Sequence, residues 1–233
     1  MFLEASYLKK GDTIGITCPA GAIDISVVEH MVNQLKAWGF VVVVGKTIGT
    51  RFHTYSASDE DRLNDLQAMI DNPEIKAIYF GRGGYGVVRI IDQINFDALK
   101  KNPKWLIGYS DITCIHSHIH SNYHCMSIHA HMSGGYLPAE QDLYATQSIY
   151  DMLFGKKVEY SMASHFLNRN GKAEGILCGG NLALLSDLIG TKSDIDTKGK
   201  ILFIEDIGEY LYNIDRMMWQ LKRADKLSTL AGL

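Results

Sequence analysis

The residue of this 233-residue chain best suited to covalent chemistry is Ser110, in the segment 106–111 (LIGYSD). An apolar run precedes it and a helix is predicted to begin at Asp111, so the serine stands in a strand-to-helix turn. Such a turn aims a hydroxyl at the carboxyl edge of a parallel sheet, and the helix N-terminus favours developing negative charge. The G-x-S-x-G string of a nucleophile elbow is incomplete, because Ile112 replaces its second glycine. The local sequence alone favours a plainer interpretation, in which Ser110 caps the helix.

A glycine-rich loop is the second candidate for chemistry. Residues 81–86 (GRGGYG) match G-x-G-x-x-G, the string of dinucleotide sites. However, they do not follow the first strand, and no acidic residue ends a second strand about 20 residues later. Consecutive glycines also let backbone N–H groups converge on an anion, which beside a serine nucleophile would form an oxyanion hole. An anion nest, a tight turn and a dinucleotide site therefore stay open.

A third group consists of histidines. Two of them, His116 and His120, stand at i and i+4, a spacing that can hold a metal ion. No H-E-x-x-H string and no acidic third ligand accompany them, so packed and surface histidines are the favoured interpretation. His116 also lies about 9 Å of helical rise beyond Ser110, which argues against it as the base for that serine. The full cluster is His116, His118, His120, His124, His129 and His131.

Glu205 is the remaining candidate. The apolar strand predicted at 201–204 delivers it to a strand's carboxyl end, where a carboxylate can orient a histidine. Asp206 and Glu209 follow closely and are typical of acids that cap the next helix. Taken alone, Glu205 fits either role.

The elements that would position these residues alternate between strands and helices. Helix signals include a Gly39 C-cap after a stripe that starts at Ile25, and a capping box at Ser58 and Asp61. A further helix is expected from the glycine loop through Ile94. This alternation predicts an α/β domain with a parallel sheet of the flavodoxin or Rossmann type. The predicted strands are 13–17, 40–44 (buried on both faces), 77–80 and 105–108.

The pattern changes after about residue 135, which predicts an N-terminal domain over 1–135. Residues 136–172 are polar and irregular and are expected to form a crossover. A partial, smaller C-terminal α/β domain is then expected over 173–233. Its signals are Gly179-Gly180-Asn181 before a helix, a strand at 200–204 and a helix at 209–223.

Composition bounds the function. Hydrophobic residues make up 46% and charged residues 21%, which excludes a mostly disordered chain. The net charge of −3 gives no basic excess for a nucleic acid. The longest apolar run, 40–44, is far below the ~20 residues of a membrane helix, and no secretory signal is visible. Four cysteines without a C-x-x-C pair suit a reducing cytoplasm, so a cytoplasmic protein without membrane contact is expected.

Four segments together carry a family resemblance. They stand in the order and spacing of the LD-carboxypeptidase family, the S66 serine peptidases, which the chain resembles from about Leu8 onward. The resemblance implies an N-terminal α/β domain joined to a smaller one, with the active site at their junction and a Ser…Glu…His triad in that chain order. The segments are 82–86 (RGGYG), 108–113 (GYSDIT), 179–182 (GGNL) and 202–207 (LFIEDI), with Arg216 downstream.

The resemblance also implies roles for single residues. Ser110 is expected to be the nucleophile and Glu205 the acid that orients the catalytic histidine. The N–H of Asp111, with that of Gly83 or Gly84, is expected to form the oxyanion hole. The family's reaction removes the terminal D-alanine of murein tetrapeptides in cytoplasmic cell-wall recycling, at a bond from an L-centre of diaminopimelate. It needs no metal or organic cofactor, and the resemblance implies a homodimer.

The chain departs from the family in two places. The family's histidine lies several tens of residues beyond its glutamate, whereas no histidine follows His165 here. We therefore expect a truncated chain that is inactive because Ser110 lacks a base, with 228–233 resembling the start of another strand. Residues 127–132 (SIHAHM) stand where relatives tend to carry His-Gly-Pro-Met. Two alternatives are hydrolysis of a peptidyl or aminoacyl-nucleotide antibiotic for self-immunity, and a non-catalytic nucleotide-binding module built on 81–86.

Overall fold

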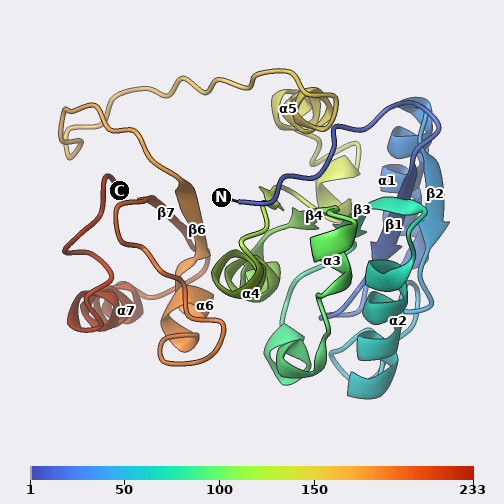
Figure 1. The fold of residues 1–233 in the computed structure, drawn as a ribbon, viewed down its shortest axis with the longest axis horizontal. Coiled ribbons are helices and arrows are strands. Elements are labelled where there is room, and N and C mark those ends of the chain that lie inside the picture. The colour runs from blue at the N-terminus through green and yellow to red at the C-terminus, as the bar shows by residue number, and fades with distance from the viewer. Residues whose placement is uncertain (1) are drawn as a thin grey trace.

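Two parallel sheets carry the fold in the computed structural model, which describes residues 2–233 (Figure 1). The strands are β1 (Thr13–Thr17), β2 (Val41–Val44), β3 (Ile75–Phe80), β4 (Trp105–Gly108), β5 (Ile128–His129), β6 (Leu177–Asn181) and β7 (Ile201–Glu205). The α-helices are α1 (Ile25–Ala37), α2 (Asp59–Asp71), α3 (Ala98–Lys101), α4 (Thr113–Tyr123), α5 (Leu143–Leu153), α6 (Leu182–Asp187) and α7 (Leu211–Arg223). Short 3-10 helices are η1 (Val87–Arg89), η2 (Ile91–Gln93), η3 (Ser110–Ile112) and η4 (Ser133–Tyr136).

The first sheet has the strand order β2-β1-β3-β4-β5, and each neighbouring pair is parallel. This is the flavodoxin-like order, which confirms the predicted fold class. Two separate hydrophobic clusters flank the sheet, one with α1 and α5 and the other with α2 and α4. The predicted α1 and α2 signals are confirmed, because Gly39 follows α1 with a φ of 95° and Ser58 accepts from the N–H of Asp61.

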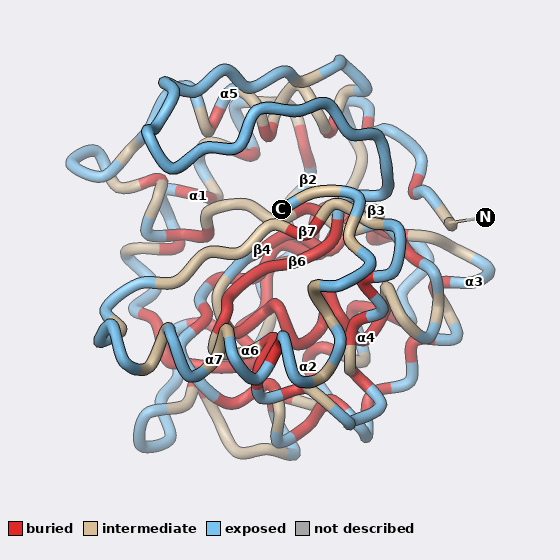
Figure 2. The backbone as a smooth tube through the Cα atoms, turned by 90° about the vertical axis from the view of Figure 1, so that its left-hand side faces the viewer, coloured by how far each residue is buried: buried red, intermediate tan, exposed pale blue. Residues whose placement is uncertain are grey.

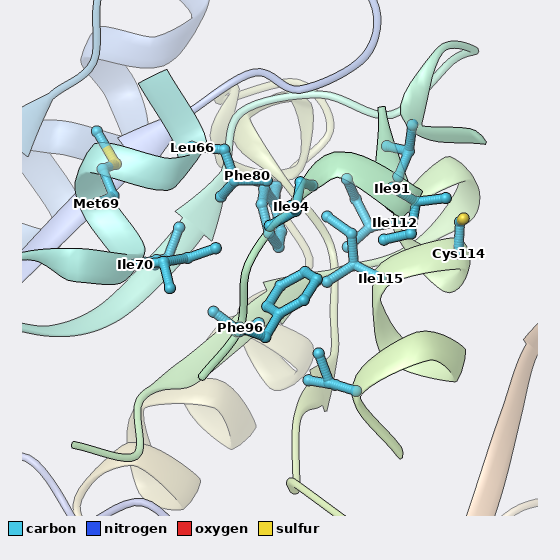
Figure 3. Packing of buried hydrophobic residues seen from close by; sticks show 14 of the residues in the cluster. Leu66, Met69, Ile70, Phe80, Ile91, Ile94, Phe96, Ile112, Cys114 and Ile115 are labelled. Carbon is cyan, nitrogen blue, oxygen red and sulfur yellow. The ribbon is translucent and has the colours of Figure 1, made fainter. Parts of the chain in front are cut away.

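The packing around β3 explains why a central parallel strand has an uninterrupted run of apolar residues. Successive side chains of a strand point to opposite faces, so both faces of β3 need apolar residues. Ile78 and Phe80 pack with α2 and α4, whereas Tyr79 packs with α1 and α5. Figure 3 shows Phe80 among side chains of α2 and α4, including Leu66 and Ile115.

The prediction that 40–44 is buried on both faces is wrong. β2 pairs only with β1 and forms the edge of the sheet, and Val41, Val43 and Val44 are 52%, 42% and 44% exposed. The β-branched run specifies a strand, but nothing in it specifies the place of that strand in the sheet.

The helix expected from the glycine loop through Ile94 is also wrong, because the loop leads into the 3-10 turns η1 and η2. The segment begins with two adjacent valines, Val87 and Val88, and adds Ile90 and Ile91. Such β-branched residues lose rotamer freedom in an α-helix, which weakens it here. Burial of Val87, Ile90 and Ile91 in the core then fixes the tighter turns.

Segment 136–172 is not irregular throughout, because it contains α5. Asp142 caps this helix by accepting from the N–H groups of Tyr144 and Ala145, and Ile149 and Leu153 bury against the first sheet. A connection without helix or strand remains over 156–176. It runs from α5 across to β6 (Figure 1), and it is mostly exposed (Figure 2).

The second sheet pairs β6 with β7 in parallel. Gly179 is required within it, since a Cβ there would lie 1.9 Å from the carbonyl oxygen of Phe203. At its start β7 also pairs with the chain end, through Ala231 N–H to the carbonyl of Lys200 at 2.8 Å. Within the described part of the chain, no helix is both long and apolar enough to span a membrane.

Contacts with α4 join the second sheet to the first. The hydroxyl of Thr113, the first residue of α4, accepts from the N–H of Asn181 at 3.0 Å. The neighbouring residue, Gly180, lets the strand approach that closely, because a Cβ there would stand 2.5 Å from the same hydroxyl oxygen. The carboxyl end of β6 is therefore held against the start of the helix that follows Ser110.

Candidate active site

Ser110 sits in a strained turn. Its φ is 61°, in the left-handed region that non-glycine residues rarely adopt, and it follows the extended Tyr109 at the carboxyl end of β4. It is the first residue of η3, and the N-cap positions of η3 and α4 are held by Tyr109 and Ile112 instead. The capping interpretation is therefore not what the structure shows, and the geometry is that of a strand-to-helix elbow despite Ile112.

The glycine loop packs directly on this serine. A Cβ on Gly83 would lie 3.1 Å from the Cβ and 3.2 Å from the Oγ of Ser110. Gly84 has a φ of 97°, which a side chain would strain. Among the described residues, neither Gly83 nor Gly84 donates its N–H to a protein acceptor. These N–H groups beside a serine hydroxyl fit the nest prediction.

The dinucleotide interpretation of 81–86 loses its structural basis. A pyrophosphate binds at the N-terminus of an α-helix, where aligned N–H groups and the helix dipole meet it. Here the loop enters the three-residue turn η1, and the first N–H of that turn, from Val87, is already bound by the Asp111 carboxylate at 2.9 Å.

Asp111 links the serine turn to the loop through its side chain, a role that sequence reasoning missed. The carboxyl group is 1% exposed, and its Oδ2 accepts from Val87 N–H. Its Oδ1 is buried without a partner. Burial raises the pKa of Asp111 to about 6. The backbone N–H predicted for the oxyanion hole is therefore that of Asp111, and the buried carboxyl group of the same residue ties it to the end of the glycine loop.

This burial predicts the effect of Asp111→Asn. Because folding raises this pKa, the protonated carboxyl group contributes fully to stability below its unfolded pKa of 3.8. That contribution is lost as the pH rises through the folded pKa of about 6, where the buried group must become charged. Asn keeps an acceptor for Val87 and carries no charge, so the variant is expected to be more stable by about 2 kcal/mol at pH 8. The two proteins should be equally stable at pH 4. Urea unfolding at both pH values checks this, and a difference independent of pH would contradict it.

Arg62 holds the other side of the loop. Its guanidinium is fully buried, and its Nη1 donates to the carbonyl oxygens of Pro19 and of Gly86, the latter at 3.0 Å. Nη2 donates to Asp59, which also binds the exposed Arg89. A single arginine in a polar helical turn carries no sequence signal for such a role.

Glu205 ends β7, opposite Asn181 in the register of the second sheet. Its side chain is 33% exposed. Burial and then the negative charge of Asp206 raise the pKa of Glu205, while the Asn181 side chain opposes them by hydrogen bonding. Asp206 itself accepts from Ala183 N–H at 3.0 Å, so it supports the start of α6 and not the following helix.

Three histidines of the cluster each have a hydrogen-bond partner of their own. His116 donates from Nε2 to the Gly108 carbonyl at 2.9 Å, and burial lowers its pKa to about 4. His118 pairs with Ser193 and His120 with Lys200. Across residues 2–233, no three or more His, Cys, Asp or Glu side chains are grouped so that they could hold a metal ion.

One histidine does reach a predicted site residue. Nε2 of His129 lies 3.9 Å from Oε1 of Glu205, so β5 and β7 bring these side chains together. No histidine nitrogen of the described chain forms a hydrogen bond with Ser110 Oγ. The structure thus joins Ser110 with Gly83, Gly84 and Asp111, and places Glu205 on the neighbouring sheet.

Together these features define the class of protein. A serine in a strained turn after a parallel strand, packed on a glycine loop, is typical of α/β hydrolases that form an acyl-enzyme. The comparisons narrow this class to a family. Residues 14–130 match the LD-carboxypeptidase N-terminal domain, and residues 174–233 match the LD-carboxypeptidase C-terminal domain.

Individual relatives agree. A probable murein peptide carboxypeptidase of Bacillus subtilis (strain 168) is 38% identical over 230 residues, which cover 97% of this chain and 72% of that protein. The murein tetrapeptide carboxypeptidase of Pseudomonas aeruginosa is 32% identical over 218 residues, covering 89% and 70%. The crystal structure of muramoyltetrapeptide carboxypeptidase from Oxalobacter formigenes superposes with a TM-score of 0.85 at 27% identity, covering 94% and 74%. The chain belongs to the LD-carboxypeptidase family, which confirms the resemblance found in the sequence.

Proposed function

We propose that this protein hydrolyses the L,D-peptide bond that releases the terminal D-alanine of murein tetrapeptide, with Ser110 as the nucleophile. The observation that carries the proposal is the left-handed turn of Ser110, packed against Gly83. Family membership supports the reaction class, and the names of the Bacillus and Pseudomonas relatives support a murein peptide as the small substrate.

In the proposed reaction, Ser110 Oγ attacks the carbonyl carbon and transfers its proton to a base. The N–H of Asp111, with that of Gly83 or Gly84, stabilises the oxyanion. The base returns the proton to the departing amine of D-alanine, which leaves the tripeptide acyl group on the serine. Water, deprotonated by the same base, then hydrolyses that ester and restores the hydroxyl. Glu205 orients the base.

We further propose that the histidine base is not supplied by residues 2–233. This rests on the lack of a histidine hydrogen-bonded to Ser110 in that range. General base catalysis contributes about 10²- to 10⁴-fold to rate, so this chain should show only residual turnover. Imidazole added to the solution should replace part of the missing base.

The substrate assay that tests this function compares two diastereomers. Purified protein with imidazole is incubated with a murein tetrapeptide ending in D-alanine, or with the same peptide ending in L-alanine, and the products are measured by mass spectrometry. We expect tripeptide and D-alanine from the first peptide only. Equal cleavage of both peptides, or of neither, would contradict the proposal.

The same assays distinguish this function from the two alternatives, an antibiotic-directed hydrolase and a nucleotide-binding module. Cleavage of an aminoacyl-nucleotide analogue with no cleavage of the tetrapeptide would favour an antibiotic-directed hydrolase. Calorimetric binding of NAD or ATP without any hydrolysis would favour a nucleotide-binding module.

The expected setting is the cytoplasm, without nucleic-acid or membrane partners. All four cysteines are buried and unpaired, which supports a reducing compartment. The homodimer implied by the family resemblance stays a prediction, and light scattering of the purified chain would test it.

A further inference from the structure

His129 lies between the two halves of the proposed site. It is the last residue of β5 and pairs in register with Gly108 of β4, two residues before Ser110. The preceding residue, Ile128, packs into the core beside α1. Because side chains alternate along a strand, His129 faces the opposite side, toward α4 and the second sheet.

Aromatic contacts hold the His129 ring in that position. The Phe203 ring of β7 meets it edge-on, with the ring centroids 4.9 Å apart. The Tyr109 ring, next to the proposed nucleophile, lies 6.0 Å away, also edge-on. Edge-to-face pairs at such distances are favourable and directional, so the ring has a defined orientation.

The polar atoms around the ring define where its proton must be. Nε2 of His129 lies 3.9 Å from Oε1 of Glu205, and that oxygen is buried without a hydrogen-bond partner. Nδ1 of His129 is likewise buried and unpartnered. The neighbouring His116 ring, with its centroid 6.3 Å away, donates its Nε2 proton to the Gly108 carbonyl, and its own Nδ1 is also buried without a hydrogen-bond partner. A proton on Nδ1 of His129 would have no acceptor within hydrogen-bond distance, whereas a proton on Nε2 would lie on the side of the Glu205 carboxylate, 3.9 Å away.

We propose that His129 is a positioning residue, whose Nε2–H donates to Oε1 of Glu205 and fixes that carboxylate. The inference deepens the proposed function and rests on it. The present separation exceeds a charge-assisted hydrogen bond by about 1 Å, and catalytic hydrogen bonds often tighten only in the substrate complex. A carboxylate has two oxygens, so anchoring Oε1 leaves Oε2 for the catalytic base.

The charges around the pair suit a neutral donor. Burial lowers the pKa of His129 to about 4, so the ring carries a single proton at neutral pH. Burial and the negative charge of Asp206 raise the pKa of Glu205, and the side chain of Asn181, opposite it on β6, works against this rise. A hydrogen-bond donor on the side of the first sheet would hold the carboxylate from the other direction.

The test measures Glu205 and His129 by NMR in the full chain. In the wild type we expect the ring ¹⁵N shifts of His129 to report the Nε2-protonated tautomer at pH 7. A ¹³C carboxyl titration should show the pKa of Glu205 rising by about one unit in His129→Phe, which keeps an aromatic ring but lacks a donor. His129→Gln restores an N–H donor and should return the pKa to within roughly 0.3 unit of the wild type.

His118→Phe is the matched control, because His118 is also buried but binds Ser193 instead. It should leave the pKa of Glu205 unchanged. An Nδ1-protonated His129, equal shifts in His129→Phe and His129→Gln, or no shift in either would overturn the proposal. None of these measurements needs turnover, so a failure of the proposed hydrolysis would be seen separately in the tetrapeptide assay.

Discussion

Replacing Ser110 by alanine is expected to abolish the imidazole-dependent release of D-alanine from murein tetrapeptide. The variant removes the only atom that the proposed mechanism uses to attack the substrate. Since general base catalysis is worth about 10²- to 10⁴-fold, added imidazole should accelerate the wild type at least tenfold and leave Ser110→Ala at the uncatalysed rate. The hydroxyl of Ser110 forms no hydrogen bond within the protein, and alanine can take the same place in the turn. The fold should therefore remain intact.

Ser117→Ala provides the matched control. Ser117 lies on α4, fully buried, and its hydroxyl has no partner. Its removal should therefore affect neither rate nor stability. Turnover retained in Ser110→Ala, or lost equally in both variants, would mean that the nucleophile is another residue.

Replacing Arg62 by methionine is expected to give the largest loss of stability. Methionine fills much of the same volume, but it leaves the carbonyl oxygens of Pro19 and Gly86 without their buried donor. Breaking a buried charged network in this way costs about 3–5 kcal/mol. Because Gly86 ends the glycine loop, the loop should also lose its fixed position beside Ser110. Urea unfolding measures the first effect, and tetrapeptide binding by calorimetry measures the second.

Arg89→Met separates burial from charge. Arg89 binds the same carboxylate, Asp59, but its side chain is 46% exposed. An ion pair exposed to solvent contributes little to stability, so this variant should unfold nearly like the wild type. Equal losses in the two variants would show that Arg62 acts only through Asp59 and does not support the loop.

Much of the architecture is predictable from local patterns. The apolar runs of β1 and β4 mark strands because these parallel strands are buried on both faces, and the capping residue Ser58 marks the start of α2. The position of a strand within the sheet depends on pairings with distant segments, so the apolar run 40–44 does not reveal that β2 forms an edge. α5 did leave a signal, because Asp142 caps it and two buried apolar residues follow at helical spacing.

The features of the proposed site also fall into those that local sequence predicts and those that depend on distant contacts. The types of Ser110 and Glu205 and their places at strand ends can be predicted, because each follows an apolar run. The left-handed φ of Ser110 and the buried carboxyl of Asp111 come from contacts with a loop far away in the sequence. The approach of His129 to Glu205 could not be predicted, because β5 has only two residues and shows no alternation.

The most direct test of Ser110 as the nucleophile is to locate the acyl group formed with the tetrapeptide. The protein is mixed with substrate and imidazole, quenched in acid at short times, digested and mapped by mass spectrometry. The account predicts a mass increase equal to the tripeptide acyl group on the peptide that contains Ser110, together with released D-alanine. An adduct on another residue, or release of D-alanine that proceeds without any adduct and persists in Ser110→Ala, would contradict it.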